Sequence, residues 1–138
     1  FRFEAGTPNI EGVIGLGAAI DYVKNIDMVN IKSHNKVIKN YCIEKLKSID
    51  GLMIYGHKTK NAGPVISFNI EGIQSYDLSQ LLAQQNIFIR SGHHCAQPIM
   101  KKLNINSSNR ASFYIYNDLG DIDYFVRGIK EAVKILSN

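Results

Sequence analysis

The chain has 138 residues, of which 45% are hydrophobic and 20% are charged, and its 16 basic and 12 acidic side chains give a formal net charge of +4. This composition is ordinary for a globular domain, and the length is sufficient to bury one core. No apolar run approaches the ~20 residues needed to cross a bilayer. The lysines are dispersed along the chain, which argues against a nucleic-acid-binding stripe.

Cysteine content and the start of the chain add two expectations. Cys42 and Cys95 are the only cysteines, too few for a disulfide scaffold, and they fit a reducing compartment such as the cytoplasm. The sequence begins at Phe1 without a signal-peptide pattern. We therefore expect one cytoplasmic domain that belongs to a longer protein.

Two helices are predicted in the first part of the chain. The pair Thr7-Pro8 is typical of a helix start, with Thr7 as the N-cap, and apolar residues follow at helical spacing as far as Val23. A second helix is predicted over 29–49. Its apolar stripe contains Cys42, so this thiol is expected to be buried and structural rather than reactive.

Strands and helices alternate in the remainder. Short strands are predicted at 52–55, 65–70, 86–90 and 110–116, and helical segments are predicted at 75–85 and 98–103. A final helix carries apolar residues at spacings of three and four as far as Leu136, with Asp121 as its expected N-cap. The pattern predicts an α+β domain, in which long helices precede a small, mostly antiparallel sheet packed with helices.

One short segment concentrates reactive side chains: Arg90-Ser91-Gly92-His93-His94-Cys95-Ala96. Residues 92–96 are predicted to form a loop that follows the strand 86–90, whose apolar run Ile87-Phe88-Ile89 is expected to be covered on both faces. A cysteine acts as a nucleophile through its thiolate, and nearby cationic groups favour that form. Cys95 is therefore a candidate nucleophile, although composition and spacing leave an unreactive, buried Cys95 equally open.

A second arginine, Arg110, is expected to lie near this segment. Arg110 opens the next predicted strand, and if the two strands are neighbours, Arg90 and Arg110 converge near Cys95. Guanidinium groups suit a carboxylate, which they hold by parallel hydrogen bonds.

Zinc is the alternative for a cluster of His and Cys, but the remaining possible ligands, including His34 and His57, are scattered. No metal site is predicted.

The segment 90–96, followed by Gln97-Pro98, closely resembles the active-site signature of group II (SufS-type) cysteine desulfurases, which belong to the class V aminotransferase family of fold-type I pyridoxal phosphate enzymes. Two more motifs resemble that family in the same order. They are Phe3-Glu4-Ala5-Gly6-Thr7-Pro8-Asn9 and Arg110-Ala111-Ser112-Phe113 with Tyr116-Asn117. The resemblance implies that residues 1–138 are the small C-terminal domain with its lead-in helix, and that the cofactor-binding large domain lies outside this chain.

The resemblance also implies an activity. The enzyme would remove sulfur from L-cysteine, giving L-alanine and a persulfide on Cys95. An acceptor protein of the SufE or SufU type would take that sulfur for iron–sulfur cluster assembly. Arg110 would hold the substrate carboxylate with support from Arg90. His93 and His94 would shape the loop or tune the thiol.

The cofactor is only partly accounted for by this sequence. The family binds pyridoxal phosphate through a lysine in a Ser-Gly-His-Lys stretch that precedes the segment containing Thr7. Thr7 itself would contact the cofactor phosphate of the opposite subunit in a homodimer. Gly56-His57-Lys58 partly matches the lysine stretch but comes after Thr7, so no Schiff-base role is expected for Lys58. The isolated chain is therefore expected to be inactive.

Two alternatives stay open at the level of sequence. The chain could be a stand-alone sulfur-carrier or interaction module that keeps the cysteine loop without a cofactor domain. It could also belong to a sibling enzyme that acts on selenocysteine or a sulfinate. The coding sequence upstream of Phe1 discriminates the first alternative from a desulfurase, because only an enzyme needs the lysine-bearing large domain.

Overall fold

The computed structural model describes residues 2–57 and 62–137, which fall into two compact units, Phe1–His34 and Asn35–Asn138. None of the helices in the described ranges is long and apolar enough to cross a membrane. The assignment of the whole chain to one small domain with a lead-in helix stays a prediction.

The first unit contains α1 (Ile10–Ile26) and the first turns of α2 (Met28–Leu46). The N-cap of α1 is Asn9, whose side-chain oxygen accepts a hydrogen bond from the backbone N–H of Gly12 at 2.9 Å. The predicted cap at Thr7 is therefore wrong; Asn caps helices as well as Thr does, and Asn9 directly precedes the first helical residue. No residue of α1 is buried. Several large apolar side chains are exposed along it: Ile10, Val13, Ile14, Leu16, Ile20 and Tyr22.

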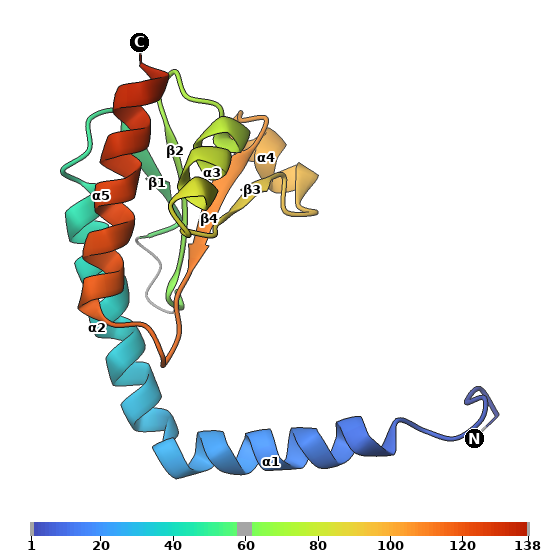
Figure 1. Cartoon of the computed structure of the whole chain (residues 1–138). Helices are drawn as coiled ribbons and strands as arrows, with labels where there is room; N and C mark the ends of the chain where they lie inside the picture. Colours follow the sequence, from blue (N-terminus) through green and yellow to red (C-terminus); the bar gives the residue numbers. More distant parts are fainter. Residues whose placement is uncertain (1, 58–61, 138) are drawn as a thin grey trace. The chain divides into compact units, whose positions relative to one another are not determined.

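The second unit has the predicted α+β architecture (Figure 1). Its four strands form one antiparallel sheet in the order β1-β2-β4-β3. Helix α4 lies beside β3 and β4, away from α5. After α2, the elements are β1 (Leu52–Tyr55), β2 (Val65–Ile70), α3 (Ser75–Gln84), β3 (Arg90–Gly92), α4 (Gln97–Leu103), β4 (Ser108–Ser112) and α5 (Leu119–Leu136).

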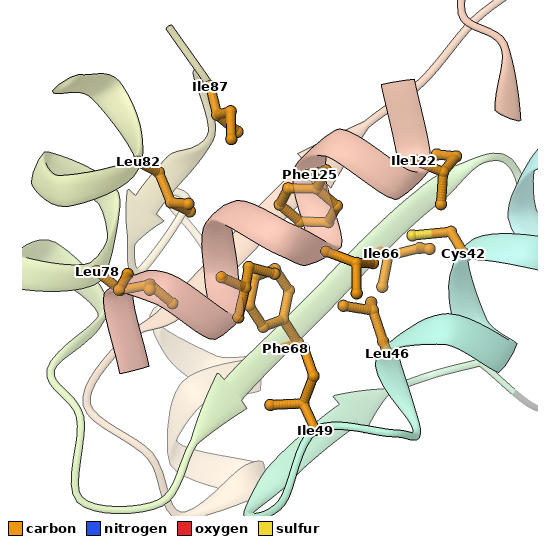
Figure 2. Close-up of a cluster of buried hydrophobic side chains, with 14 of the residues drawn as sticks. Cys42, Leu46, Ile49, Ile66, Phe68, Leu78, Leu82, Ile87, Ile122 and Phe125 are labelled. Atoms are coloured by element: carbon orange, nitrogen blue, oxygen red, sulfur yellow. The ribbon is translucent and has the colours of Figure 1, made fainter. Parts of the chain in front are cut away.

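The core of this unit lies between one face of the sheet and helices α2, α3 and α5 (Figure 2). Side chains alternate along β2, so Ile66 and Phe68 point into the core while Ser67 points to the opposite face. Phe68 is fully buried, and its ring meets the ring of Phe125 edge-on at 6.0 Å. The helices therefore cover one face of the sheet and leave the face of Ser67 for other contacts.

The thiol of Cys42 is part of this core. Its residue has no exposed surface, and burial raises the pKa of the thiol to about 12. Because the thiolate is the reactive form of cysteine, a thiol with such a pKa is inert near neutral pH. The prediction of a buried, structural Cys42 is confirmed.

The predicted strand over 86–90 is wrong, because the observed strand β3 spans Arg90–Gly92. Asn86 adopts a left-handed backbone conformation with φ of 58°, which ends α3 and redirects the chain. Ile87 is buried, but Phe88 is 80% exposed. The run Ile87-Phe88-Ile89 is therefore covered on one side only, and not on both sides as expected for the buried strand predicted there.

Strand β4 also differs from its prediction, since it spans Ser108–Ser112 instead of 110–116. Beyond the strand, the backbone N–H of Tyr114 donates to the side-chain oxygen of Asn117 at 2.9 Å, which folds this part of the chain into a turn. The earlier start of β4 matters for the reactive segment, because it brings Ser108 into the sheet opposite Gly92.

The N-cap of α5 is Asp118 and not the predicted Asp121. The carboxylate of Asp118 accepts from the backbone N–H of Asp121 at 3.0 Å, and the carboxylate of Asp121 accepts from the backbone N–H of Asp118 at 3.2 Å. Both residues thus take part in a reciprocal capping box, with Asp121 in its third helical position.

Candidate functional site

The segment predicted to be reactive forms β3 and a tight turn that leads into α4. His94 and Cys95 have φ values of 54° and 56°, so two consecutive non-glycine residues adopt the left-handed conformation. Such residues cost about 1 kcal/mol or more each, and they persist only where surrounding contacts hold them. The turn is closed by the backbone N–H of Ala96, which donates to the carbonyl of His93 at 2.8 Å. Cys95 is free and exposed at its tip.

The thiol of Cys95 lies beside a guanidinium group. The distance from Nη2 of Arg90 to Sγ of Cys95 is 4.0 Å, the long end of a hydrogen bond to sulfur. Arg90 is the first residue of the three-residue strand β3, so the sheet fixes its backbone while the turn that follows the strand returns the thiol toward it. The structure thus places a permanent positive charge next to the candidate nucleophile.

Arg90 and Arg110 are directly opposite each other on neighbouring antiparallel strands. The pairing of β3 with β4 meets the condition set by the sequence prediction, and the convergence of the two arginine side chains on one site stays a prediction. Like charges in this cross-strand position are unfavourable, and neither side chain forms an ion pair within the described residues. An anion bound between the two guanidinium groups would relieve this repulsion.

The line of directly paired residues that contains the two arginines continues across the sheet to β2 and β1. Arg110 pairs with Ser67 on β2, and Ser67 pairs with Tyr55 on β1. Because directly opposed residues share a face, Tyr55, Ser67, Arg110 and Arg90 form one line on the face away from the core. Sequence reasoning missed Tyr55 and Ser67, because their relation to Arg110 depends on a register that no local pattern reveals.

His94 anchors the cysteine turn to β4. Its Nε2 lies 2.9 Å from the carbonyl oxygen of Ser108 and 3.2 Å from the hydroxyl oxygen of the same residue. A carbonyl oxygen can only accept, so Nε2 carries the proton and donates it. Ser108 is 2% exposed, which makes it a rigid partner. This bond explains how the left-handed turn is held, and it supports the predicted loop-shaping role of His94, which stays a proposal.

The pKa of His94 lies below its usual range. Burial is the largest cause, and the positive charges of Arg110 and Arg90 lower the pKa further, although the hydrogen bond to Ser108 opposes the shift. His94 is therefore neutral near pH 7. With its proton on Nε2, the Nδ1 atom keeps a free lone pair, and Nδ1 is buried without a hydrogen-bond partner in the described part of the chain.

The lowered pKa of His94 predicts a pH dependence of stability. The unfolded chain takes up a proton near the ordinary histidine pKa of 6.5, whereas the folded chain does so only at lower pH. The free energy of unfolding should therefore fall as the pH drops below about 6.5. Urea unfolding at about pH 7.5 and about pH 5.5 measures this loss. In His94→Gln, which keeps a donor but cannot titrate, the loss should be smaller; an identical loss would show that His94 is not its source.

An open cavity of about 620 Å³ lies on the free face of the sheet, and we call it the sheet cavity. Tyr55, Ser67 and Arg110 line it from the sheet, and His94 lines it from the turn. Residues of α4 complete it on the other side, among them Ile99, Met100 and Leu103. Cys95 does not line it, although its two chain neighbours do. The turn therefore borders the cavity and also carries the thiol.

The remaining predicted site residues lie elsewhere or outside the described ranges. His93 is exposed, and Thr7 is exposed in the first unit. Lys58 lies outside the described residues, while Nδ1 of its neighbour His57 is 3.1 Å from the carbonyl oxygen of Ile54. Within residues 2–57 and 62–137, no three His, Cys, Asp or Glu side chains are grouped as metal ligands would be.

The contrast between the two cysteines predicts selective thiol chemistry. The exposed Cys95 should react quickly with an aromatic disulfide reagent such as DTNB, whereas the buried Cys42 should react only on unfolding. We expect one fast-reacting thiol per native chain and two in denaturant. Cys95→Ala should abolish the fast phase, and a fast phase that survives this substitution would show that Cys42 is accessible.

Comparison with known proteins gives a consistent result. The family model for class V aminotransferases matches residues 1–125. A probable cysteine desulfurase from Halalkalibacterium halodurans is 42% identical over 96% of this chain, and a cysteine desulfurase from Haloferax volcanii is 39% identical over 99% of it. The matched region is 32% of each relative. The chain thus spans about a third of the length of these relatives.

Solved structures agree with the sequence comparison. An apo cysteine desulfurase from Thermococcus onnurineus has 41% identity and a TM-score of 0.88 over 96% of this chain and 33% of its own. The cysteine desulfurase CsdA from Escherichia coli has 30% identity and the same TM-score over 97% of this chain and 33% of its own. A NifS-like protein with 20% identity and a TM-score of 0.77 shares the fold. From the match over residues 1–125, this chain belongs to the class V aminotransferase family.

Proposed function

We propose that residues 1–138 form the C-terminal domain of a group II, pyridoxal phosphate-dependent cysteine desulfurase, with Cys95 as the sulfur acceptor. The observation that carries the proposal is the exposed Cys95 thiol 4.0 Å from the Arg90 guanidinium, on a turn anchored beside the cross-strand pair of Arg90 and Arg110. The relatives named cysteine desulfurase support the reaction class. The segment His93-His94-Cys95 supports the group II type.

In the proposed reaction, the Cys95 thiolate attacks the sulfur atom of L-cysteine. An S–S bond forms while the bond between Cβ and sulfur in the substrate breaks. The electron pair of the broken bond stays on Cβ, which takes up a proton and becomes the methyl group of L-alanine. Cys95 is left as a persulfide. The substrate carbon is reduced as the two sulfur atoms are oxidised, so the step needs no external oxidant or reductant.

The two arginines have separate roles in this proposal. Arg110 holds the substrate carboxylate, since it lines the sheet cavity beside the turn and its guanidinium can hold a carboxylate by two parallel hydrogen bonds. Arg90 supports the sulfur end, because its Nη2 lies beside Sγ of Cys95. His94 holds the turn through Ser108, and the exposed His93 shapes the turn through its backbone carbonyl or tunes the thiol.

Class V aminotransferases and cysteine desulfurases depend in general on pyridoxal phosphate, which withdraws electrons from the substrate. The described residues do not by themselves fit this group, because the segment 90–96 has no lysine and Thr7 belongs to the other compact unit. We therefore assign the lysine anchor to sequence upstream of Phe1. Thr7 would contact the cofactor phosphate of the opposite subunit in a homodimer.

The same proposal covers the fate of the sulfur. An exposed persulfide on Cys95 is accessible to an acceptor protein, and we propose a SufE- or SufU-type acceptor that delivers sulfur to iron–sulfur cluster assembly in the cytoplasm. Accessibility supports this step, because transfer between proteins requires the two sulfur atoms to meet.

The upstream coding sequence and the whole protein test the proposal. We expect a large domain with the Ser-Gly-His-Lys lysine before Phe1, and release of one L-alanine for each persulfide sulfur from L-cysteine. The isolated 138 residues should release none. A start codon at Phe1 would favour the sulfur-carrier alternative, and a strong preference for L-selenocysteine over L-cysteine would favour the selenocysteine enzyme.

A further inference from the structure

Helix α3 has two buried serines, Ser75 and Ser79, and it contacts both β3 and β4. The serines are one helical turn apart, so they lie on the same face of the helix. Apolar residues such as Leu78 and Leu82 of the same helix are buried without the cost of desolvating a hydroxyl. A buried serine at such a position therefore needs a hydrogen-bond partner.

Each of the two serines has a partner in the strands that carry the cysteine turn, or next to them. The Oγ of Ser75 lies 2.6 Å from the Oγ of Ser107, the residue before β4. The Oγ of Ser79 lies 3.0 Å from the Oγ of Ser91 in β3 and 2.7 Å from the carbonyl oxygen of Tyr76. Because a carbonyl oxygen can only accept, the single hydroxyl proton of Ser79 goes to Tyr76. The hydroxyl of Ser91 must then donate to Ser79.

Strand β3 depends on this bond more than an inner strand would. It has three residues and lies at the edge of the sheet, so within the described residues its backbone pairs with β4 alone. Side chains alternate along a strand, so Ser91 points toward α3 while Arg90 points to the opposite face. The bond between Ser91 and Ser79 therefore fixes the rotation of β3 about its own axis. That rotation decides where the guanidinium of Arg90 lies.

We propose that Ser79 is a positioning residue, which acts through Ser91 to keep the Arg90 guanidinium beside the Cys95 thiol, 4.0 Å away. The inference deepens the proposed function and rests on it for the role of the Cys95 thiolate. The hydrogen bonds that carry it do not depend on any substrate. It adds to the site a residue of α3, which lies outside the segment 90–96.

Ser79→Ala in the whole protein tests this inference. The kcat for L-alanine release from L-cysteine should fall roughly tenfold, because the guanidinium is no longer held at the thiol. The KM should stay unchanged, since Arg110 is on β4 and keeps its pairing with β2. Alkylation of Cys95 by iodoacetamide, followed by mass spectrometry of its peptide, should slow about fivefold. Ser79→Thr keeps the hydroxyl and should restore both rates. Unchanged rates in Ser79→Ala, or no recovery in Ser79→Thr, would overturn the proposal.

A double-mutant cycle tests whether the bond between the two hydroxyls is responsible. Ser91→Ala should cause the same losses as Ser79→Ala, and the double variant should lose no more than either single variant, because one hydrogen bond joins the two residues. Additive losses would contradict the proposed route through Ser91.

The matched control is Ser48→Ala. The hydroxyl of Ser48 donates to the carbonyl oxygen of Lys45, three residues earlier, at 2.8 Å, as that of Ser79 does to Tyr76, but Ser48 is exposed beyond the end of α2. Its loss should leave both rates unchanged. A lower free energy of unfolding in Ser79→Ala, with kcat per folded molecule unchanged, would show a purely structural role and overturn the proposal.

Failure of this inference can be distinguished from failure of the proposed function. If Cys95 of the unsubstituted protein gains no sulfur from L-cysteine, the proposed function fails. If Cys95 gains sulfur and Ser79→Ala reacts as fast as the unsubstituted protein, only the inference about Ser79 fails.

Discussion

Replacing Cys95 by Ser in the whole protein should abolish persulfide formation and reduce L-alanine release from L-cysteine by roughly a thousandfold or more, the scale seen when a catalytic nucleophile is removed. The hydroxyl has nearly the same size as the thiol, so the turn between β3 and α4 should keep its shape. Serine, however, cannot accept sulfur to form a persulfide. Alanine detection and a persulfide assay on the purified variant measure both losses.

The matched control is Cys42→Ala, which removes the other thiol. Since Cys42 is fully buried in the core, this variant should lose stability but retain turnover per folded molecule. Full activity in Cys95→Ser, or equal losses in both variants, would contradict the role of Cys95 as nucleophile.

Replacing Arg110 by Ala should mainly weaken substrate binding, raising the KM for L-cysteine about 10- to 100-fold, because the carboxylate loses a charged partner. Arg110→Lys should recover only part of the affinity, since an ammonium group keeps the charge but not the planar pair of donors. The measurement is the KM and kcat of each variant with L-cysteine.

Arg127→Ala is the control for charge removal. Arg127 lies on α5 with its guanidinium over the ring of Tyr124, outside the sheet cavity, so its loss should leave the KM unchanged. A KM unaltered in Arg110→Ala would contradict the carboxylate role. A matched rise in both variants would indicate that net charge, and not the position of Arg110, controls binding.

The fold could be predicted in class because periodicity is a local property. The apolar stripe of the second predicted helix identified Cys42 as a buried residue, and the structure confirms that it is buried. The predicted helix starts were wrong where the hydrogen bond of a single capping side chain fixes the first residue of the helix. Asn9 caps α1 in place of the predicted Thr7, and Asp118 caps α5 in place of the predicted Asp121. The sequence does not show which of two nearby polar residues accepts the hydrogen bond from the first turn of the helix.

Only the part of the site that lies within one short stretch of the sequence could be predicted. Cys95, His94 and Arg90 are close in sequence, so their proximity follows from the chain itself. Arg110 required the additional assumption that β3 and β4 pair, which the register confirms. Ser108 and Tyr55 could not be found, because one depends on the reach of the His94 ring and the other on the pairing of β1 with β2.

The most direct measurement of the central claim is mass spectrometry of the whole protein after reaction with L-cysteine in the absence of an acceptor or reductant. The account predicts that the peptide containing Cys95 gains the mass of one sulfur atom, that the peptide containing Cys42 gains none, and that a thiol reductant removes the added sulfur. Added sulfur on Cys42, or L-alanine release with no sulfur on Cys95, would contradict it.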